Sequence, residues 1–123
     1  MWEACNLTRS WNDPNKDINR KLAFQAELFF VGEIESQIIA SAMAGYDGHR
    51  GSVFYLAIKP ELQNSGYGRA LTTYIENVLS NLGCPKVNIA IRTTNLTVID
   101  FYSSRGYAQD DVINVSKRLI SDV

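Results

Sequence analysis

A glycine-rich segment of the chain combines the residue types that bind a phosphate group. Gly66 and Gly68 are separated by one residue, between an apolar run that ends near Pro60 and a stretch with helical periodicity. Glycine lets the backbone approach a ligand closely, and the first turn of a helix presents N–H groups without helical partners at the positive end of the helix dipole. The sequence therefore predicts an anion site in residues 63–69.

Two familiar nucleotide-binding motifs do not match this segment. The phosphate loop of nucleoside triphosphatases needs Lys and then Ser or Thr after its last glycine, whereas Arg69 and Ala70 follow Gly68. The dinucleotide fingerprint needs a third small residue where Leu71 stands. It also needs an acidic residue about 20 positions later, at the end of the next strand, where this chain has Arg92. The pattern that fits is Gln/Arg-x-x-Gly-x-Gly/Ala between a strand and a helix.

That pattern resembles the GCN5-related N-acetyltransferase (GNAT) superfamily, in which the segment binds the pyrophosphate of acyl-coenzyme A. Residues 56–61 resemble the strand exit that precedes the motif, and Asn95 with residues 101–107 resembles its second half. The resemblance covers roughly residues 28–118. Residues 11–14 and 45–51 also resemble one small bacterial branch of this superfamily, the YpeA-like proteins.

The resemblance implies acetyl-coenzyme A as the acyl donor and an amine of a small molecule or peptide as the acceptor, without a metal. The pyrophosphate would lie on the N–H groups of residues 64–69, and the amides of the pantetheine arm would pair with the backbone at Ala57 and Ile58. The residues that the resemblance assigns to the cofactor are Ala57, Ile58, Gln63, Asn64, Ser65, Gly66, Tyr67, Gly68, Arg69, Asn95 and Tyr102.

Acetyl transfer to an amine needs a donor for the oxyanion and an acid for the leaving thiolate. Tyr102 matches the tyrosine that serves the family as this acid. A phenol with a pKa of about 10 can share its proton with a thiolate whose pKa is about 8.5 as charge develops. The neighbouring Phe101 and Tyr107 are predicted as core residues, and the oxyanion donor would be a backbone N–H within residues 56–58.

The base that takes the proton from the amine has several candidates. Some family members carry an acidic residue where this chain has Ser52, so that assignment does not transfer. The candidates are then Glu33, Asp47 and His49, the single histidine, whose ordinary pKa suits base catalysis near neutral pH. Asp47 precedes Gly48 and fits a turn residue better. A chain of water molecules without a dedicated base is an equal alternative.

Composition and charge name no function but exclude several classes. The chain has 123 residues, enough for a single domain, and its net charge of -1 without a basic run argues against a broad nucleic-acid surface. Cys5 and Cys84 are distant in sequence and lack zinc-ligand spacing, which favours free thiols in a reducing cytoplasm. No apolar stretch is long enough to span a membrane, and no signal-peptide pattern begins the chain, so we expect a cytoplasmic location and no membrane partner.

Upstream of the glycine-rich segment, the sequence predicts one helix and three antiparallel strands. The helix covers residues 15–25 and follows a turn in which Trp11 and Asp13 are candidate substrate contacts, or else a packed ring and a helix cap. The strands cover residues 28–34, 38–46 and 52–58, and the third is apolar at nearly every position, as in a strand covered on both faces. The helix residues predicted to form an apolar stripe are Ile18, Leu22, Gln25 and Ala26, with Lys16, Asp17, Arg20 and Lys21 outside it.

Downstream, a helix over residues 66–82 is predicted to end at Gly83, and residues 87–92 to form a strand parallel to 52–58. Asn95 would cap a helix that ends before Gly106. The closing strands are expected at Tyr107 and at 112–117. The apolar positions predicted for the helix over residues 66–82 are Leu71, Tyr74, Ile75, Val78, Leu79 and Leu82.

We therefore expect an α+β fold, a mixed and mainly antiparallel sheet with helices on both faces and a central βαβ unit. Residues 1–123 would form one GNAT-like domain without the family's usual N-terminal strand, which leaves a sheet edge that could pair in a homodimer. The leading function is an N-acetyltransferase. The alternatives are a catalytically idle sensor of acyl-coenzyme A and an assembly protein that recruits a partner through its open edge.

Overall fold

The computed structural model of the chain describes residues 13–121. The predictions about Trp11, Cys5 and the missing N-terminal strand lie outside these residues. The chain divides into two compact units, one that extends to Ile89 and one that spans Ala90–Ser121. The sheet and the glycine-rich segment belong to the first unit, and Asn95 and Tyr102 belong to the second.

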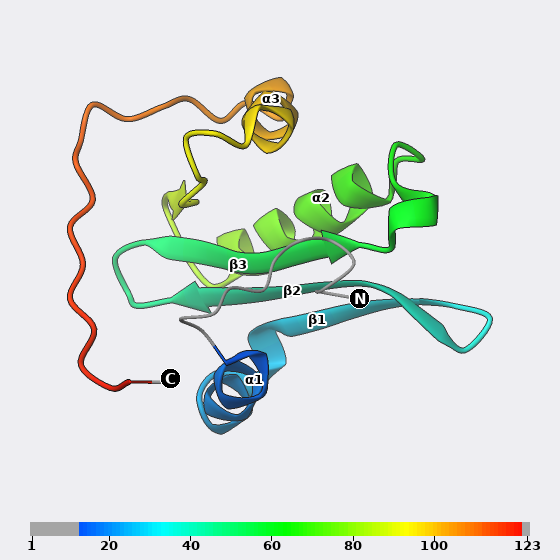
Figure 1. Cartoon of the computed structure of the whole chain (residues 1–123), viewed down its shortest axis with the longest axis horizontal. Coiled ribbons are helices and arrows are strands. Elements are labelled where there is room, and N and C mark those ends of the chain that lie inside the picture. Colours follow the sequence, from blue (N-terminus) through cyan, green and yellow to red (C-terminus); the bar gives the residue numbers. More distant parts are fainter. Residues whose placement is uncertain (1–12, 122–123) are drawn as a thin grey trace. The chain divides into compact units, whose positions relative to one another are not determined.

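The first unit contains a four-stranded sheet in the order β1-β2-β3-β4 (Figure 1). The first three strands pair antiparallel, and β4 pairs parallel to β3, so the predicted mixed, mainly antiparallel sheet is confirmed. The turn between β1 and β2 places Glu35 and Ser36 at positive φ. The strands are β1 Phe29–Ile34, β2 Gln37–Tyr46, β3 Gly51–Ile58 and β4 Val87–Asn88.

The fourth strand is much shorter than the predicted 87–92. Val87 pairs with Gly51 and Asn88 pairs with Ser52, and the parallel ladder ends there. The strand length predicted from the alternation of apolar residues beyond Asn88 is therefore wrong. A strand needs a neighbouring backbone to accept and donate its hydrogen bonds, and alternation reports only which side chains share a face.

The third strand is covered less completely than its apolar sequence predicts. Val53 and Ala57 are buried, but the Phe54 ring is 53% exposed. The strand also departs from a regular ladder, because Met43 pairs with Phe54 and Ser41 pairs with Ala57. Two residues of β3 thus lie opposite one residue of β2, which is the arrangement of a β-bulge.

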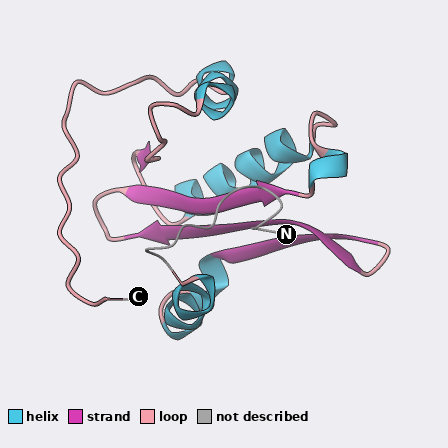
Figure 2. Cartoon of the chain, viewed as in Figure 1, coloured by secondary structure: helices cyan, strands magenta, loops and turns pink. Residues whose placement is uncertain are grey.

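The core of the first unit lies between the sheet and α2, which spans Tyr67–Asn81 and runs along β3 (Figures 1 and 2). Two of the predicted apolar positions are exposed instead, Tyr74 by 58% and Leu82 by 52%. Thr72 is buried in their place, and its hydroxyl donates to the Gly68 carbonyl at 2.8 Å, which satisfies the polar group. The buried residues of the core cluster are Leu28, Ala42, Ala44, Val53, Ile75 and Leu79.

The end of α2 follows the prediction from its glycine. Gly83 has a φ of 90°, and its N–H donates to the Ser80 carbonyl at 2.9 Å. The N–H of Cys84 donates to the Leu79 carbonyl at 3.0 Å. These two bonds form a Schellman motif, in which a residue without a Cβ takes the left-handed position.

The second unit contains α3, Leu96–Ser104, and no described strand. Asn95 caps this helix by accepting from the N–H of Val98 at 3.4 Å, as predicted, and Gly106 follows it with a φ of 91°. Residues 107–121 are irregular, with Ile113 90% exposed, so the prediction of closing strands is wrong for this structure. β-Favouring side chains alone do not make a strand, because a strand also needs the backbone of a neighbouring strand.

Candidate active site

The glycine-rich segment lies between the end of β3 and the start of α2. A short 3₁₀ turn, η2 (Pro60–Leu62), follows the strand, and Gly66 occupies the N-cap position of α2 with a φ of 89°. No side chain caps this helix. The other two α-helices of the described residues have such caps, from Asp13 and Asn95. The first-turn N–H groups of α2 thus keep their capacity to bind an anion.

Backbone and side-chain contacts hold the segment at the end of the sheet. The Gln63 amide donates to the Ile58 carbonyl at 3.0 Å, and the N–H of Lys59 donates to the Ile39 carbonyl at 2.7 Å. Tyr67 packs against the buried cluster that contains Ile39 and Ile58. Gln63 and Tyr67 therefore fix the segment from both ends.

The remaining residues predicted to bind the pyrophosphate lie at the surface. Asn64, Ser65 and Gly66 are exposed, as is Arg69 in the first turn of the helix, and Gly68 is partly buried. Asn64 also has a positive φ of 63°, which asparagine tolerates better than most residues. The segment therefore presents backbone N–H groups and one cationic side chain to solvent.

The strand end next to this segment carries Ala57 and Ile58, the residues predicted to contact the pantetheine arm. Ala57 and Ile58 are 3% and 9% exposed and pair on one side with β2. The parallel pairing between β3 and β4 involves only Gly51 and Ser52 of β3 and ends well before this strand end. The structure thus brings Ala57, Ile58 and Gln63 together within the first unit.

Tyr102 lies within the second unit and is 4% exposed. Its ring contacts Phe101 edge-on at a centroid distance of 5.0 Å and Tyr107 at 5.3 Å. Such edge-to-face pairs fix the plane of the central ring. The Tyr102 phenol, which was predicted as the acid, therefore belongs to a packed cluster of three aromatic rings. The Asn95 side chain, in the same unit, caps α3.

The candidate bases lie at exposed positions. Glu33 is exposed on β1, and His49 is exposed in the loop after β2, with its Nδ1 3.5 Å from the Arg50 guanidinium. The Asp47 carboxylate accepts from the N–H groups of His49 at 2.8 Å and Arg50 at 2.7 Å. These bonds from Arg50 and His49 lower the pKa of Asp47. Asp47 thus acts as the predicted turn residue.

Comparison with known proteins identifies the family. The model of the family described as acetyltransferase (GNAT) matches residues 1–107. The chain belongs to the GNAT family of acetyltransferases. An acetyltransferase of Yersinia enterocolitica is 47% identical over 122 residues, which are 99% of this chain and 86% of the relative. The family predicted from the glycine-rich segment and its neighbours is thereby confirmed.

Solved structures agree with this GNAT assignment at the level of the fold. Ard1 of Thermoplasma volcanium superposes with a TM-score of 0.77 at 16% identity, over 88% of this chain and 74% of that one. The aminoglycoside acetyltransferase AAC(6')-Iy, in complex with a bisubstrate analogue, has a TM-score of 0.71 at 17% identity, over 92% and 85% of the two chains. The α+β fold predicted from the sequence is confirmed.

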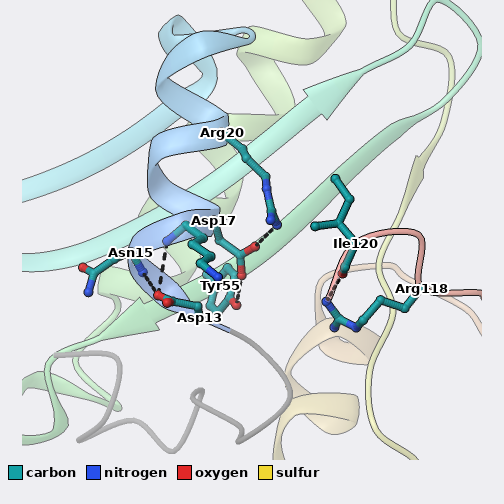
Figure 3. Close-up of polar contacts among 8 residues, drawn as sticks. Asp13, Asn15, Asp17, Arg20, Tyr55, Arg118 and Ile120 are labelled. Atoms are coloured by element: carbon teal, nitrogen blue, oxygen red, sulfur yellow. Dashed lines mark hydrogen bonds and ion pairs between the residues drawn. The ribbon is translucent and has the colours of Figure 1, made fainter. Parts of the chain in front are cut away.

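The structure also shows contacts that the sequence interpretation of this GNAT chain missed. Asp17 and Lys21 were placed outside the apolar stripe of the helix predicted at residues 15–25, but both contact the sheet. The Tyr55 hydroxyl donates to Asp17 at 2.5 Å (Figure 3). The Lys21 ammonium donates to the Ala44 carbonyl. Gln25, just past the helix, donates to the Tyr46 carbonyl at 2.8 Å and accepts from the Tyr46 N–H at 3.2 Å.

The signal for the contacts of Asp17 and Lys21 was present as their spacing of four residues, which places both on one face of the helix. Gln25 lies beyond the end of the helix at Ala23, so this spacing does not predict its contact. Leu22, predicted in the apolar stripe, is 59% exposed, so that prediction is wrong. Burial lowers the pKa of Lys21, and the negative charge of Glu27 opposes this effect.

Two further properties concern the described residues as a set. Within residues 13–121, no three or more His, Cys, Asp and Glu side chains are grouped in a way that could hold a metal ion. None of the helices in this part of the chain has the length and apolar character needed to cross a membrane.

Proposed function

We propose that the protein transfers an acetyl group from acetyl-coenzyme A to an amine by direct attack. One observation carries the proposal. In a GNAT chain, the helix that follows the glycine-rich segment has no side-chain cap, and the Gln63–Ile58 hydrogen bond holds that segment at the end of β3. GNAT acetyltransferases bind acetyl-coenzyme A and an amine acceptor, and AAC(6')-Iy was solved with a bisubstrate analogue that contains coenzyme A.

The donor would be bound by the residues predicted from the sequence. The N–H groups of residues 64–69 would bind the pyrophosphate at the positive end of the α2 dipole, and the Arg69 guanidinium would add a positive charge. The amides of the pantetheine arm would pair with the backbone at Ala57 and Ile58, beyond the end of the β3–β4 ladder. The Asn95 side chain, which caps α3, would also contact the pantetheine arm.

The reaction would form a C–N bond and break the C–S bond of the thioester. The neutral amine would attack the carbonyl carbon, and a backbone N–H within residues 56–58 would stabilise the oxyanion. The thiolate sulfur would take its proton from the Tyr102 phenol as the C–S bond breaks. The proton lost by the amine would pass to His49 or to a chain of water molecules, and from there to solvent.

The first experiment is calorimetric titration of the protein with acetyl-coenzyme A, together with coenzyme A release in the presence of a panel of amines. Binding with turnover supports the transferase and begins to identify the acceptor. Binding without turnover for every amine supports the idle sensor, and absence of binding rejects the acyl-donor site.

Tyr102→Phe tests the acid. It keeps the ring packed between Phe101 and Tyr107 and removes the hydroxyl. We expect kcat to fall by roughly 100-fold, because general acid catalysis contributes about that much, with little change in the affinity for acetyl-coenzyme A. An unchanged kcat would remove Tyr102 from the mechanism.

We also propose that β1 allows self-association. Among the described residues it pairs with β2 alone and forms one edge of the sheet, and Val31 on this strand is 53% exposed. An open strand edge can pair with the same edge of a second copy. Solution scattering over a concentration series tests this, since a monomer mass at every concentration contradicts it.

A further inference from the structure

The β-bulge in β3 lies immediately before the strand end of the proposed donor site. Tyr55 and Leu56 lie opposite Ala42, between the pairs Met43–Phe54 and Ser41–Ala57. A bulge turns the peptide groups of the strand that carries the extra residue relative to those of a regular ladder. The direction of the backbone N–H groups at Leu56 and Ala57 therefore depends on the bulge.

The bulge places Tyr55 in an unfavourable backbone conformation. Its φ is 52°, in the left-handed region, which bulky side chains rarely adopt because Cβ approaches the carbonyl oxygen. Such a conformation persists where surrounding contacts determine it. A contact of the Tyr55 side chain is therefore a candidate for what holds the bulge.

One contact of the Tyr55 side chain comes from a distant segment. The Tyr55 hydroxyl donates to Asp17 Oδ2 at 2.5 Å, across 38 residues of sequence. The other oxygen, Oδ1, lies 3.5 Å from Arg20 Nη1, and the Asp17 side chain is 24% exposed (Figure 3). A hydrogen bond to a carboxylate is stronger than one between neutral groups, and partial burial weakens the competition from water.

The helix that carries Asp17 is held on the sheet by other contacts as well. Lys21, and Gln25 just after the helix, bond to the backbone of β2 at Ala44 and Tyr46. The Asp17 carboxylate is thus presented from a helix that is already attached. The hydrogen bond to Tyr55 can then be removed without detaching the helix.

We propose that Asp17 and Tyr55 are positioning residues for acetyl transfer. Their hydrogen bond holds the bulge in its left-handed form, and this directs the peptide groups at Leu56 and Ala57 toward the acyl carbonyl. The role rests on the proposed function, in which those peptide groups supply the oxyanion donor. Neither side chain touches the reacting atoms in this proposal.

Steady-state kinetics of Tyr55→Phe and Asp17→Leu test the role. Each variant removes the hydrogen bond and keeps a side chain of similar size. We expect kcat to fall between about 10- and 100-fold, because small misplacements of an oriented group cost rate of that order. The KM for acetyl-coenzyme A should change much less than kcat, since the glycine-rich segment that would bind the pyrophosphate is untouched. Asp17→Asn retains an acceptor and should recover most of the lost kcat.

The matched control is Lys21→Met, which removes a different contact between the same helix and the sheet. It should lower the melting temperature and leave kcat within about twofold of the wild type, because the bulge keeps its hydrogen bond. Wild-type kcat in both Tyr55→Phe and Asp17→Leu overturns the proposal. A loss of kcat in Lys21→Met as large as that in Tyr55→Phe also overturns it.

A second measurement does not depend on turnover. Amide hydrogen exchange followed by NMR should be about tenfold faster at Leu56 and Ala57 in Tyr55→Phe than in the wild type, since the lost bond holds the local structure closed. Exchange at Ile75, in the core, should not change. Unchanged exchange at the bulge overturns the positioning role. If the wild type shows no turnover, the proposed function fails, while hydrogen exchange still decides whether the bond holds the bulge.

Discussion

The two longer helices of the first unit are attached to the same sheet by opposite means. α2 is attached by apolar burial, with Ile75 and Leu79 each 1% exposed. α1 (Pro14–Ala23) buries no residue and is attached by one hydrogen bond that Asp17 accepts and one that Lys21 donates. Apolar burial acts over an area and tolerates small shifts, whereas each hydrogen bond depends on one distance and direction.

This difference explains why one helix was predicted well and the other was not. An apolar stripe identifies the buried face of a helix, because transfer of apolar area from water is the main driving force of packing. A polar residue has no such preference, and its partner depends on what the fold brings near. In α1, Asp17 and Lys21 were therefore assigned to solvent although both contact the sheet.

The largest expected effect concerns the apolar packing of α2 against the sheet. Leu79→Ala removes a side chain that is 1% exposed, and we expect a loss of about 2–5 kcal/mol in the free energy of unfolding. Leu82→Ala, at the 52% exposed end of the helix, should cost less than about 1 kcal/mol. Urea unfolding of both variants measures this, and equal losses would contradict the assigned packing.

The next prediction compares the two ends of α2. Gly66 and Gly83 both have positive φ and open space around the position of a Cβ, so valine should strain the backbone similarly at each. Gly66→Val should also weaken acetyl-coenzyme A binding by about 100-fold or more, because a side chain blocks approach to the backbone N–H groups. Gly83→Val should leave the calorimetric affinity unchanged. Equal affinities in the two variants would argue against the site.

A smaller effect is expected at the start of α1. Asp13 accepts from the N–H groups of Asn15 at 2.9 Å and Lys16 at 3.2 Å, and its replacement by alanine should cost about 1 kcal/mol. Asp13→Asn should cost much less, since asparagine caps helices equally well. Thermal unfolding measures both. A negligible loss in Asp13→Ala would show that the polar contacts of α1 carry little of its stability.

The smallest effect concerns the loop after β2. Hydrogen bonds from the backbone N–H groups of Arg50 and His49 lower the pKa of Asp47 in the folded protein. The ionised carboxylate therefore contributes stability above the ordinary aspartate pKa of about 3.9, and this contribution is lost as the pH falls through the lowered value. Asp47→Ala should melt slightly below the wild type at pH 7. A difference that stays constant down to pH 2 would contradict the assignment.

The elements predicted well are those whose signals are local. Asp47 before Gly48 indicated a turn, Asn95 a helix cap, and Gly83 a helix end, and each residue has that role. The glycine-rich segment indicated the family for a similar reason, since its chemistry lies in consecutive residues. Its contact with Ile58 through Gln63 spans five residues.

The elements predicted poorly need a partner elsewhere in the chain. The length of β4 depends on how far β3 runs beside it, and residues 112–117 have β-favouring side chains without a ladder to join. The bulge at Tyr55 is a mismatch in count between two strands, which neither strand reveals alone.

The sequence by itself determined the family, the antiparallel strands and the segment with free first-turn N–H groups, because periodicity and glycine act on neighbouring residues. Only the tertiary structure decided that Asp17 meets Tyr55 at the bulge and that Lys21 and Gln25 bond to β2. Hydrogen-bonding groups are satisfied by any suitable partner, so their pairing follows from the packed arrangement of the chain rather than from the order of its residues.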